Sequence, residues 1–226
     1  MTPSDPPQID AAARVAGLKQ LHPLLSSCGE SPARAEGVQG SVEPPPLQRL
    51  VRPGVLLDCL GESGAGAGLI ALWLCRLACQ SRGELVVVDA TGEFYPPAAI
   101  AWGIDARRLL VVSPATPNQA LAVVEQSLRS PAVGAVWAPL GRIGLQPFRR
   151  LLLAAEAGYA FATLVRSPRR LPDACCADYQ FHFRALPGCG SSSKAIMVRA
   201  TQTRSRHGRL EGDRELTIDW RAGTIR

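Results

Sequence analysis

Hydrophobic and polar positions along residues 47–165 alternate between two kinds of segment. Short, dense apolar runs, several of them rich in β-branched residues, predict buried strands at residues 55–60, 84–89, 109–113, 133–137 and 159–165. Stretches with helical spacing lie between them and predict helices at residues 69–80, 96–102, 118–129 and 146–157, the third capped by Asn118. Strands that alternate with helices at this spacing indicate a parallel sheet covered on both faces.

The pattern changes after residue 165, where helical spacing stops. Residues 179–183, 195–201 and 215–220 alternate apolar and polar positions and predict strands of an antiparallel extension. The expected fold class is therefore α/β: a three-layer α/β/α core whose mostly parallel sheet is extended by antiparallel C-terminal strands. The helix at residues 69–80 is apolar on nearly every side, so we expect it to be sandwiched in the core.

The N-terminal part has a different character. Residues 9–25 have helical spacing, and residues 26–46 are rich in Ser, Gly, Pro and Glu, as is typical of a linker. We divide the chain into an N-terminal helix (1–25), a linker (26–46), a core (47–188) and a C-terminal β extension with an arginine-rich loop (189–226).

Composition excludes several classes of protein. Of 226 residues, 46% are hydrophobic and 19% charged, which is typical of a globular chain. The densest apolar run, residues 69–75, is too short to span a membrane, and the N-terminus lacks a basic-then-apolar leader, so we expect a cytoplasmic protein without membrane contact. The seven cysteines include no CxxC pair and there are three histidines, so neither a zinc site nor a disulfide framework is expected.

Charge is unevenly distributed within a net charge of +6. Residues 1–130 hold ten basic and twelve acidic side chains, whereas residues 131–226 hold fifteen and seven. A basic C-terminal half permits contact with nucleic acid, and an arginine-rich soluble surface explains the same count equally well.

Candidate chemistry lies in the glycine-rich turn Gly61-Glu62-Ser63-Gly64-Ala65-Gly66-Ala67-Gly68, between the first strand and its helix. A phosphate-binding loop of the GxxxxGK[ST] kind uses backbone N–H groups to cradle oxygens, a lysine for the β- and γ-phosphates, and a hydroxyl for magnesium. Gly61 and Gly66 are in register with that pattern, but Ala67 replaces the lysine and Gly68 the hydroxyl. The pattern predicts a loop that keeps the architecture and has lost the nucleotide chemistry.

Residues 55–137 resemble the ATPase core of the RecA recombinase family. The resemblance is carried by Asp89-Ala90, Pro96, Gly103-Ile104-Asp105, Leu109-Leu110, Pro114, Thr116, Gln119-Ala120-Leu121 and Arg129-Ser130. It implies a RecA-like fold.

The working residues of that family fall on unsuitable side chains here. Besides Ala67 and Gly68, the resemblance places the water-activating glutamate on Thr91, the metal-associated aspartate near Pro139 and the adenine-stacking tyrosine near Ala98. It therefore implies no ATPase activity, no catalytic or metal-binding residue and no cofactor. Substitution of the lysine by Arg76 or Arg82 stays open, although their predicted positions point away from the loop.

Two groups of arginines are candidate contacts for DNA or a protein partner. Arg166, Arg169 and Arg170 fall on the predicted loop after the fifth strand, where they would grip phosphates or form a solvated turn. Arg204, Arg206 and Arg209 fall on a predicted exposed loop between two strands, for which we favour a protein partner because no stacking aromatic accompanies them.

A second resemblance is narrower. The run Leu151-Leu152-Leu153-Ala154-Ala155-Glu156-Ala157-Gly158 and the ending from Ile196-Met197-Val198 to Arg204, Arg206, His207 and Gly208 are similar to the ImuA family of bacterial mutagenesis cassettes. It implies an accessory factor in DNA-damage-induced (SOS) translesion synthesis. The implied partners are an ImuB-like Y-family polymerase homologue, an error-prone replicative-type polymerase and RecA, with weak DNA contact left open. A SulA-type cell-division inhibitor and a RecA paralogue that still binds nucleotide or DNA are the alternatives.

Three further positions have more than one interpretation. The adjacent Cys175 and Cys176 are interpreted as structural rather than redox-active, and His182 as a strand residue rather than a ligand. Asp58, in an otherwise apolar strand, indicates either a sheet edge or a pair with an arginine.

Overall fold

The computed structural model of the chain describes residues 46–80, 83–168, 175–187, 195–208, 213–219 and 222–226. The chain divides into the units Met1–Glu43 and Pro44–Arg226, and every described residue belongs to the second unit. The predicted helix at residues 9–25 and almost all of the predicted linker lie outside the described residues.

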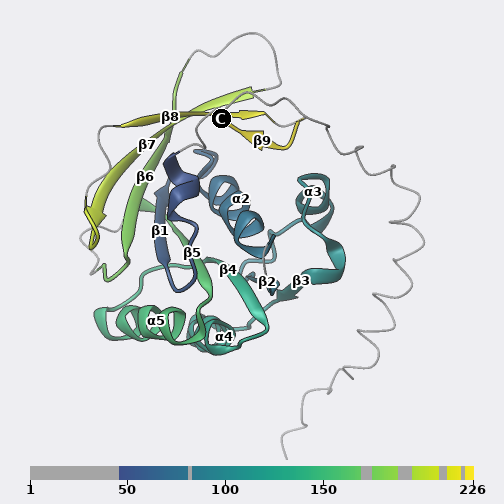
Figure 1. The fold of residues 1–226 in the computed structure, drawn as a ribbon, viewed down its shortest axis with the longest axis vertical. Helices are drawn as coiled ribbons and strands as arrows, with labels where there is room; N and C mark the ends of the chain where they lie inside the picture. Colours follow the sequence, from purple (N-terminus) through teal and green to yellow (C-terminus); the bar gives the residue numbers. More distant parts are fainter. Residues whose placement is uncertain (1–45, 81–82, 169–174, 188–194, 209–212, 220–221) are drawn as a thin grey trace, which may run out of the picture. The chain divides into compact units, whose positions relative to one another are not determined.

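The described strands form one nine-stranded sheet with the order β3-β2-β4-β5-β1-β6-β7-β8-β9 (Figure 1). The strands are β1 (Leu56–Gly61), β2 (Glu84–Val88), β3 (Leu109–Val112), β4 (Val133–Pro139), β5 (Phe161–Arg166), β6 (Tyr179–Ala185), β7 (Ala195–Ser205), β8 (Arg214–Asp219) and β9 (Thr224–Ile225). The helices are η1 (Pro46–Leu50), α2 (Ala67–Cys79), α3 (Pro96–Ala101), η2 (Ala106–Arg108), α4 (Pro117–Arg129) and α5 (Leu145–Gly158).

The sheet is parallel from β3 to β6 and antiparallel from β7 onwards, which confirms the predicted fold class. One detail of the prediction is wrong, because β6 is not purely part of the antiparallel extension. It pairs in parallel with β1 on one side and antiparallel with β7 on the other. Strand β6 therefore joins the parallel core to the extension.

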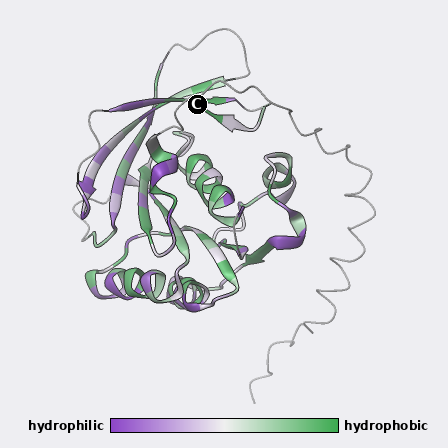
Figure 2. Cartoon of the chain, viewed as in Figure 1, coloured by the Kyte–Doolittle hydropathy of each residue, from purple (hydrophilic) through white to green (hydrophobic). Residues whose placement is uncertain are grey.

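Helices cover both faces of the parallel part of the sheet. Helices α2 and α3 lie on one face and α4 and α5 on the other, as Figure 1 shows. Each face has its own buried hydrophobic cluster, one centred on α2 and one on α4 and α5. In Figure 2, α4 and α5 have one hydrophobic and one hydrophilic side, whereas α2 is predominantly hydrophobic.

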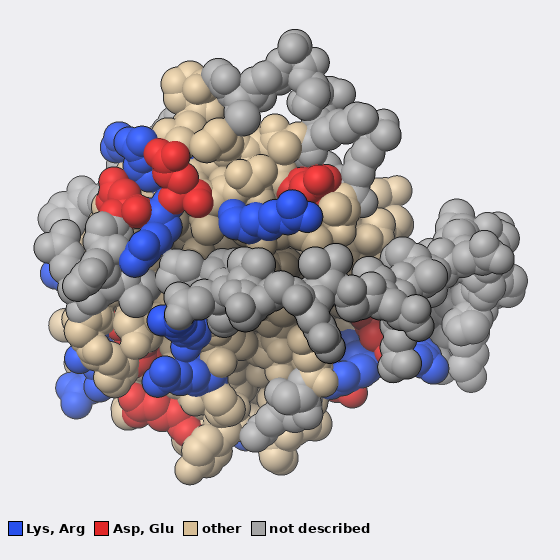
Figure 3. Space-filling view, turned by 45° about the horizontal axis from the view of Figure 1, so that its top comes forward, with Lys and Arg blue, Asp and Glu red and all other residues tan. Residues whose placement is uncertain are grey.

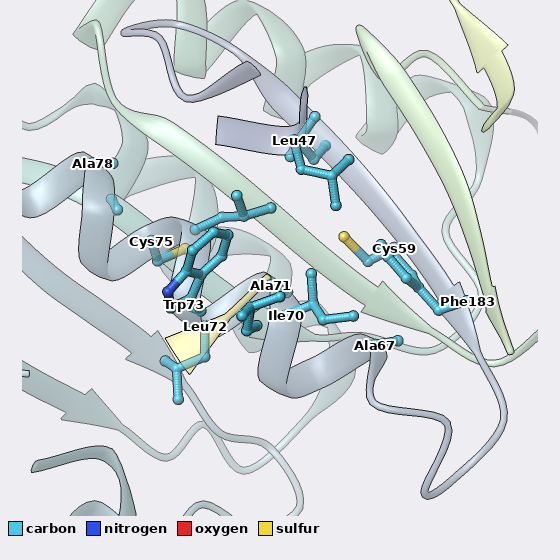
Figure 4. Packing of buried hydrophobic residues seen from close by; sticks show 14 of the residues in the cluster. Leu47, Cys59, Ala67, Ile70, Ala71, Leu72, Trp73, Cys75, Ala78 and Phe183 are labelled. Atoms are coloured by element: carbon cyan, nitrogen blue, oxygen red, sulfur yellow. The ribbon is translucent and has the colours of Figure 1, made fainter. Parts of the chain in front are cut away.

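Helix α2 is buried from two directions, as predicted from its apolar surface. Ile70, Ala71 and Cys75 are completely buried, and Figure 4 shows them packed with Leu47, Cys59 and other apolar side chains. The same cluster contains residues from the antiparallel extension: Val198, Leu216, Ile218 and Ile225. The extension therefore covers α2 on the side away from the parallel strands.

Most predicted elements are present with boundaries shifted by a few residues, and two local assignments are wrong. The N-cap of α4 is Thr116, whose Oγ1 accepts a hydrogen bond from the Gln119 backbone N–H at 3.2 Å, and not Asn118. Strand β7 runs to Ser205 instead of ending near residue 201, so Arg204 lies in a strand. Strand β9 is two residues long, too short to produce an alternating pattern.

In the part of the chain that the structure describes, no helix is long and apolar enough to cross a membrane. Within the same residues, no group of three or more His, Cys, Asp or Glu side chains is arranged to hold a metal ion.

Candidate functional site

The glycine-rich turn connects β1 to α2, as the sequence predicts. The turn is closed by a hydrogen bond from the Ala65 N–H to the Glu62 carbonyl at 2.9 Å. Gly64 and Gly66 have φ values of +80° and +85°, the left-handed region that glycine adopts without a steric penalty. The Ile70 N–H donates to the Gly66 carbonyl at 2.9 Å and starts the helix.

Apolar groups pack against the second half of this turn, whereas Glu62, Ser63 and Gly64 are exposed. Ala67, at the position of the family's phosphate-binding lysine, is 4% exposed, and a Cβ placed on Gly61 would lie 2.7 Å from its methyl carbon. A Cβ placed on Gly66 would lie 3.0 Å from both Val198 Cγ2 and Ile218 Cδ1. The turn is thus packed against β7 and β8 of the extension.

An indole lies beside the first turn of α2. Trp137, near the end of β4, donates a hydrogen bond from Nε1 to the Gly68 carbonyl oxygen at 2.9 Å. Its ring also packs at a tilt against Phe94, with 5.6 Å between the centroids. Gly68 is the position of the family's magnesium-binding hydroxyl, so an aromatic side chain stands next to the site where that hydroxyl is expected.

A cavity of about 380 Å³ opens between α2, the segment that joins β2 to α3, and the end of β4. Four of the five positions that the RecA resemblance singled out line it: Gly68, Thr91, Ala98 and Pro139. The cavity is also lined by four aromatic and two acidic residues: Phe94, Tyr95, Trp102, Trp137, Asp89 and Glu93. The structure therefore brings these separate sequence positions together. The aromatic lining was not predicted, because its residues come from three elements with no shared motif.

Asp89 organises the segment on one side of this cavity. Its Oδ1 accepts hydrogen bonds from the Thr91 backbone N–H at 3.2 Å, the Thr91 hydroxyl at 3.0 Å and the Gly92 N–H at 2.9 Å. Its Oδ2 accepts one from the Phe94 N–H at 2.9 Å. Burial alone would raise the pKa of Asp89, but these hydrogen bonds to the charged form outweigh it and hold the pKa below the ordinary value. The carboxylate is therefore charged near neutral pH and fixes the loop that carries Phe94.

Arg166 is not on a surface loop, and that prediction is wrong. It is the last residue of β5, is 4% exposed, and donates hydrogen bonds from Nε and Nη2 to Asp58 Oδ1 and Oδ2 at 2.8 and 2.6 Å. Its guanidinium also lies 5.3 Å from the centre of the Phe148 ring. Asp58 therefore pairs with an arginine, one of the two interpretations of this residue. The other, a sheet edge, is wrong, because β1 is a central strand. Arg169 and Arg170 lie outside the described residues.

Hydrogen bonds connect the ion pair of Asp58 and Arg166 to the antiparallel extension. Gln180 of β6 donates from Nε2 to Asp58 Oδ2 at 2.7 Å, and Thr203 of β7 donates from Oγ1 to Gln180 Oε1 at 2.8 Å. We call Asp58, Arg166, Gln180 and Thr203 the Asp58 network. It links four neighbouring strands across the junction of core and extension.

The C-terminal arginines are also more engaged than predicted. Arg204 is exposed but donates to the Cys175 carbonyl at 3.3 Å, and Arg206 contacts Glu156 at 3.2 Å and the buried Asp178 at 3.3 Å. Arg209 lies outside the described residues. On the described surface in Figure 3, basic side chains alternate with acidic ones instead of forming one continuous positive area.

Cys175 is half-buried beside the Asp58 network. Burial, with a smaller contribution from the negative charge of Asp58, raises the pKa of its thiol to about 11. A thiol that stays protonated near neutral pH is a poor nucleophile, which favours the structural interpretation of this cysteine.

Comparison with known proteins relates the chain to recombinases. It is 31% identical to the RecA protein of Symbiobacterium thermophilum over 169 residues and 29% identical to that of Chlorobium limicola over 170 residues. Each alignment covers 75% of this chain and 45% of the relative, so the chain spans less than half the length of the curated relatives it matches. No protein-family model matches.

The fold is similar to that of a solved recombinase. The crystal structure of the RadB recombinase superposes with a TM-score of 0.60 at 17% identity, covering 79% of this chain and 94% of that one. This likeness supports a RadB-like α/β fold with the same mostly parallel sheet.

Proposed function

Because the chain is homologous to the RecA superfamily, we propose that it is a non-catalytic RecA-like accessory protein of DNA-damage-induced translesion synthesis, acting through protein–protein contacts. The non-catalytic part rests on the turn between β1 and α2. The translesion part rests on the resemblance of residues 151–158 and 196–208 to the ImuA family.

The observation that carries the proposal is the burial of Ala67. Transfer of a phosphoryl group requires cations that position it and neutralise the developing charge. At the lysine position this chain has a methyl group packed against Gly61 in the hydrophobic cluster. Ala67 contributes to the packing of α2 and offers no cation to a ligand.

The charges of the cavity support the same conclusion. Among the described residues that line it, none is lysine or arginine, whereas Asp89 and Glu93 are acidic. A nucleoside triphosphate would meet like charges there, which is unfavourable in a partly buried site. The Trp137 indole beside Gly68 also takes space next to the expected metal position.

Nucleotide binding is tested by calorimetric titration of the full chain with Mg-ATP, together with a hydrolysis assay. We expect no binding at ATP concentrations up to about 1 mM, so that any affinity for ATP is weaker than that of a functional nucleotide site. The variants Ala67→Lys and Ala67→Lys/Gly68→Thr should also fail to turn over ATP, because Trp137 and the acidic residues remain. Micromolar ATP affinity or measurable turnover by the unaltered chain would contradict the non-catalytic assignment and favour a nucleotide-binding RecA paralogue.

The partner assignment is tested by capture of the full chain from DNA-damaged cells and by binding to purified candidates. We expect recovery of an ImuB-like Y-family polymerase homologue, an error-prone replicative-type polymerase or RecA. The exposed Arg204 provides a variant, Arg204→Ala, and the exposed Arg199, paired with Glu215 at 2.8 Å, provides the matched control, Arg199→Ala. Recovery of a cell-division protein instead of a polymerase would favour the SulA-type alternative.

A further inference from the structure

We propose that the cavity between α2, the β2–α3 segment and the end of β4 receives the guanidinium group of an arginine presented by a partner protein. We call the cavity, with its lining residues Phe94, Tyr95, Trp102, Trp137, Asp89 and Glu93, the aromatic socket. The proposal rests on the proposed function in one respect, namely that no nucleotide occupies this space.

Three of the four aromatic residues that line the socket are held in place by other contacts. Trp137 is fixed by its hydrogen bond to the Gly68 carbonyl and packs against Phe94. Trp102 is 8% exposed, and its carbonyl accepts a hydrogen bond from Arg76 Nη1 at 2.8 Å. Tyr95 is 67% exposed. The faces of such rings attract cations that approach within about 6 Å of their centres.

The charged side chains among the described lining residues of the socket, Asp89 and Glu93, are both acidic. Asp89 is a buried, charged carboxylate whose oxygens are occupied by the hydrogen bonds of its own loop, so it contributes a fixed negative charge. Glu93 is exposed on the same loop and is able to meet a ligand directly. Since no described lining residue is basic, the socket is electrostatically complementary to a cation.

Among biological cations, the guanidinium of arginine fits both features. It is planar, stacks on aromatic faces and pairs with carboxylates through a rigid set of donors, whereas an ammonium group is a strongly hydrated point charge. The chain already holds one guanidinium in this manner, since Arg166 lies 5.3 Å from the Phe148 ring while it pairs with Asp58. The socket volume of about 380 Å³ lies at the lower end of ligand pockets, a suitable size for one side chain.

The test is an NMR titration of the full chain, with the tryptophan indole N–H signals as the readout. The probe is the blocked peptide acetyl-Gly-Arg-Gly-amide, and its control carries citrulline, the neutral counterpart of arginine. We expect the arginine peptide to shift the signals of Trp102 and Trp137 but not that of the buried Trp73 in α2. We expect the citrulline peptide to bind about ten-fold more weakly.

Variants locate the site. Glu93→Gln should weaken binding of the arginine peptide about three-fold, and Tyr95→Ala should weaken it by a similar factor. The control is Glu84→Gln, which removes the same charge from an exposed residue at the start of β2, whereas the socket lies beyond the end of that strand. It should leave the affinity unchanged.

Several outcomes would overturn the proposal. Equal affinity for the arginine and citrulline peptides, or no shift of the Trp137 signal at about 10 mM peptide, would exclude a guanidinium site. Tighter peptide binding by a full-length variant with Arg14, Lys19 and Arg34 replaced by alanine would assign the socket to the N-terminal segment of this chain instead of a partner. If the chain binds neither the peptide nor ATP, only the arginine site is contradicted. If the chain binds ATP, the proposed function itself is contradicted.

Discussion

The two faces of strand β1 carry different chemistry. On one face Leu57 and Cys59 pack into the hydrophobic cluster around α2. On the other face Asp58 is completely buried and pairs with Arg166. The strand leads into a turn that RecA-like proteins use for phosphate, yet its charged residue is directed to the joint between core and extension. The buried charge of this region therefore joins core and extension, whereas Ala67 at the start of α2 packs among apolar groups.

Removal of the buried charge should have the largest effect. Asp58→Asn removes the carboxylate charge that faces the buried Arg166 guanidinium, so we expect the free energy of unfolding to fall by about 3–5 kcal/mol. Urea denaturation of the full chain measures this change. The double variant Asp58→Leu/Arg166→Met should recover most of the loss, because it removes both charges. A loss below about 1 kcal/mol in the single variant would show that the pair is not needed to join the strands.

Two glycines of the turn provide a matched comparison on the apolar side. Both Gly64→Ala and Gly66→Ala place a side chain at positive φ, which costs about 1–2 kcal/mol. Nothing lies within 4 Å of a Cβ at Gly64, whereas a Cβ at Gly66 would crowd the side chains of Val198 and Ile218. We therefore expect Gly66→Ala to be more destabilising by about 1–2 kcal/mol in urea denaturation. Equal costs would mean that the extension does not pack on the turn.

The pH dependence of Asp89 tests the loop beside the socket. Its pKa in the folded state is lowered from 3.8, so its stabilising contribution is present above that value and is lost as pH falls through the folded pKa. Asp89→Asn should lower the free energy of unfolding by about 1–3 kcal/mol near pH 7. The difference from the unaltered chain should shrink in acid, below the ordinary aspartate range. A difference that is constant from pH 7 to acid would contradict the charged role.

Exposed charges should matter least. Arg199→Ala removes a pair in which both side chains are about half exposed, and we expect no resolvable change in the free energy of unfolding. Arg206→Ala should cost somewhat more, about 1 kcal/mol, because Arg206 also contacts the buried Asp178. Thermal or urea unfolding of the two variants in parallel measures the difference. A larger loss for Arg199→Ala would reverse the expected order.

Local patterns were sufficient where neighbours along the chain determine the structure. The apolar runs predicted strands β1 to β5 of the parallel sheet, and the glycine-rich turn was found between the expected strand and helix. The positions carried over from the RecA resemblance, such as Thr91 and Ala98, line one cavity. The patterns failed at the end of a strand. Arg166 was assigned to a loop because it is charged, although it directly follows an apolar run and is the last residue of β5.

The sequence by itself determined the alternation of strands and helices, the presence of Ala67 and Gly68 where the resemblance expects lysine and a hydroxyl, and the antiparallel end of the chain. These features depend on periodicity and on residue identity, both of which are local. Only the tertiary structure decided that Arg166 pairs with Asp58, that Trp137 lies beside Gly68, and that β7 and β8 pack against Gly66. These contacts join residues far apart in sequence, 108 positions for Asp58 and Arg166 and 69 for Trp137 and Gly68. A buried charge or polar group is stable only with a partner. Which residue becomes that partner depends on which strands and helices the fold brings together.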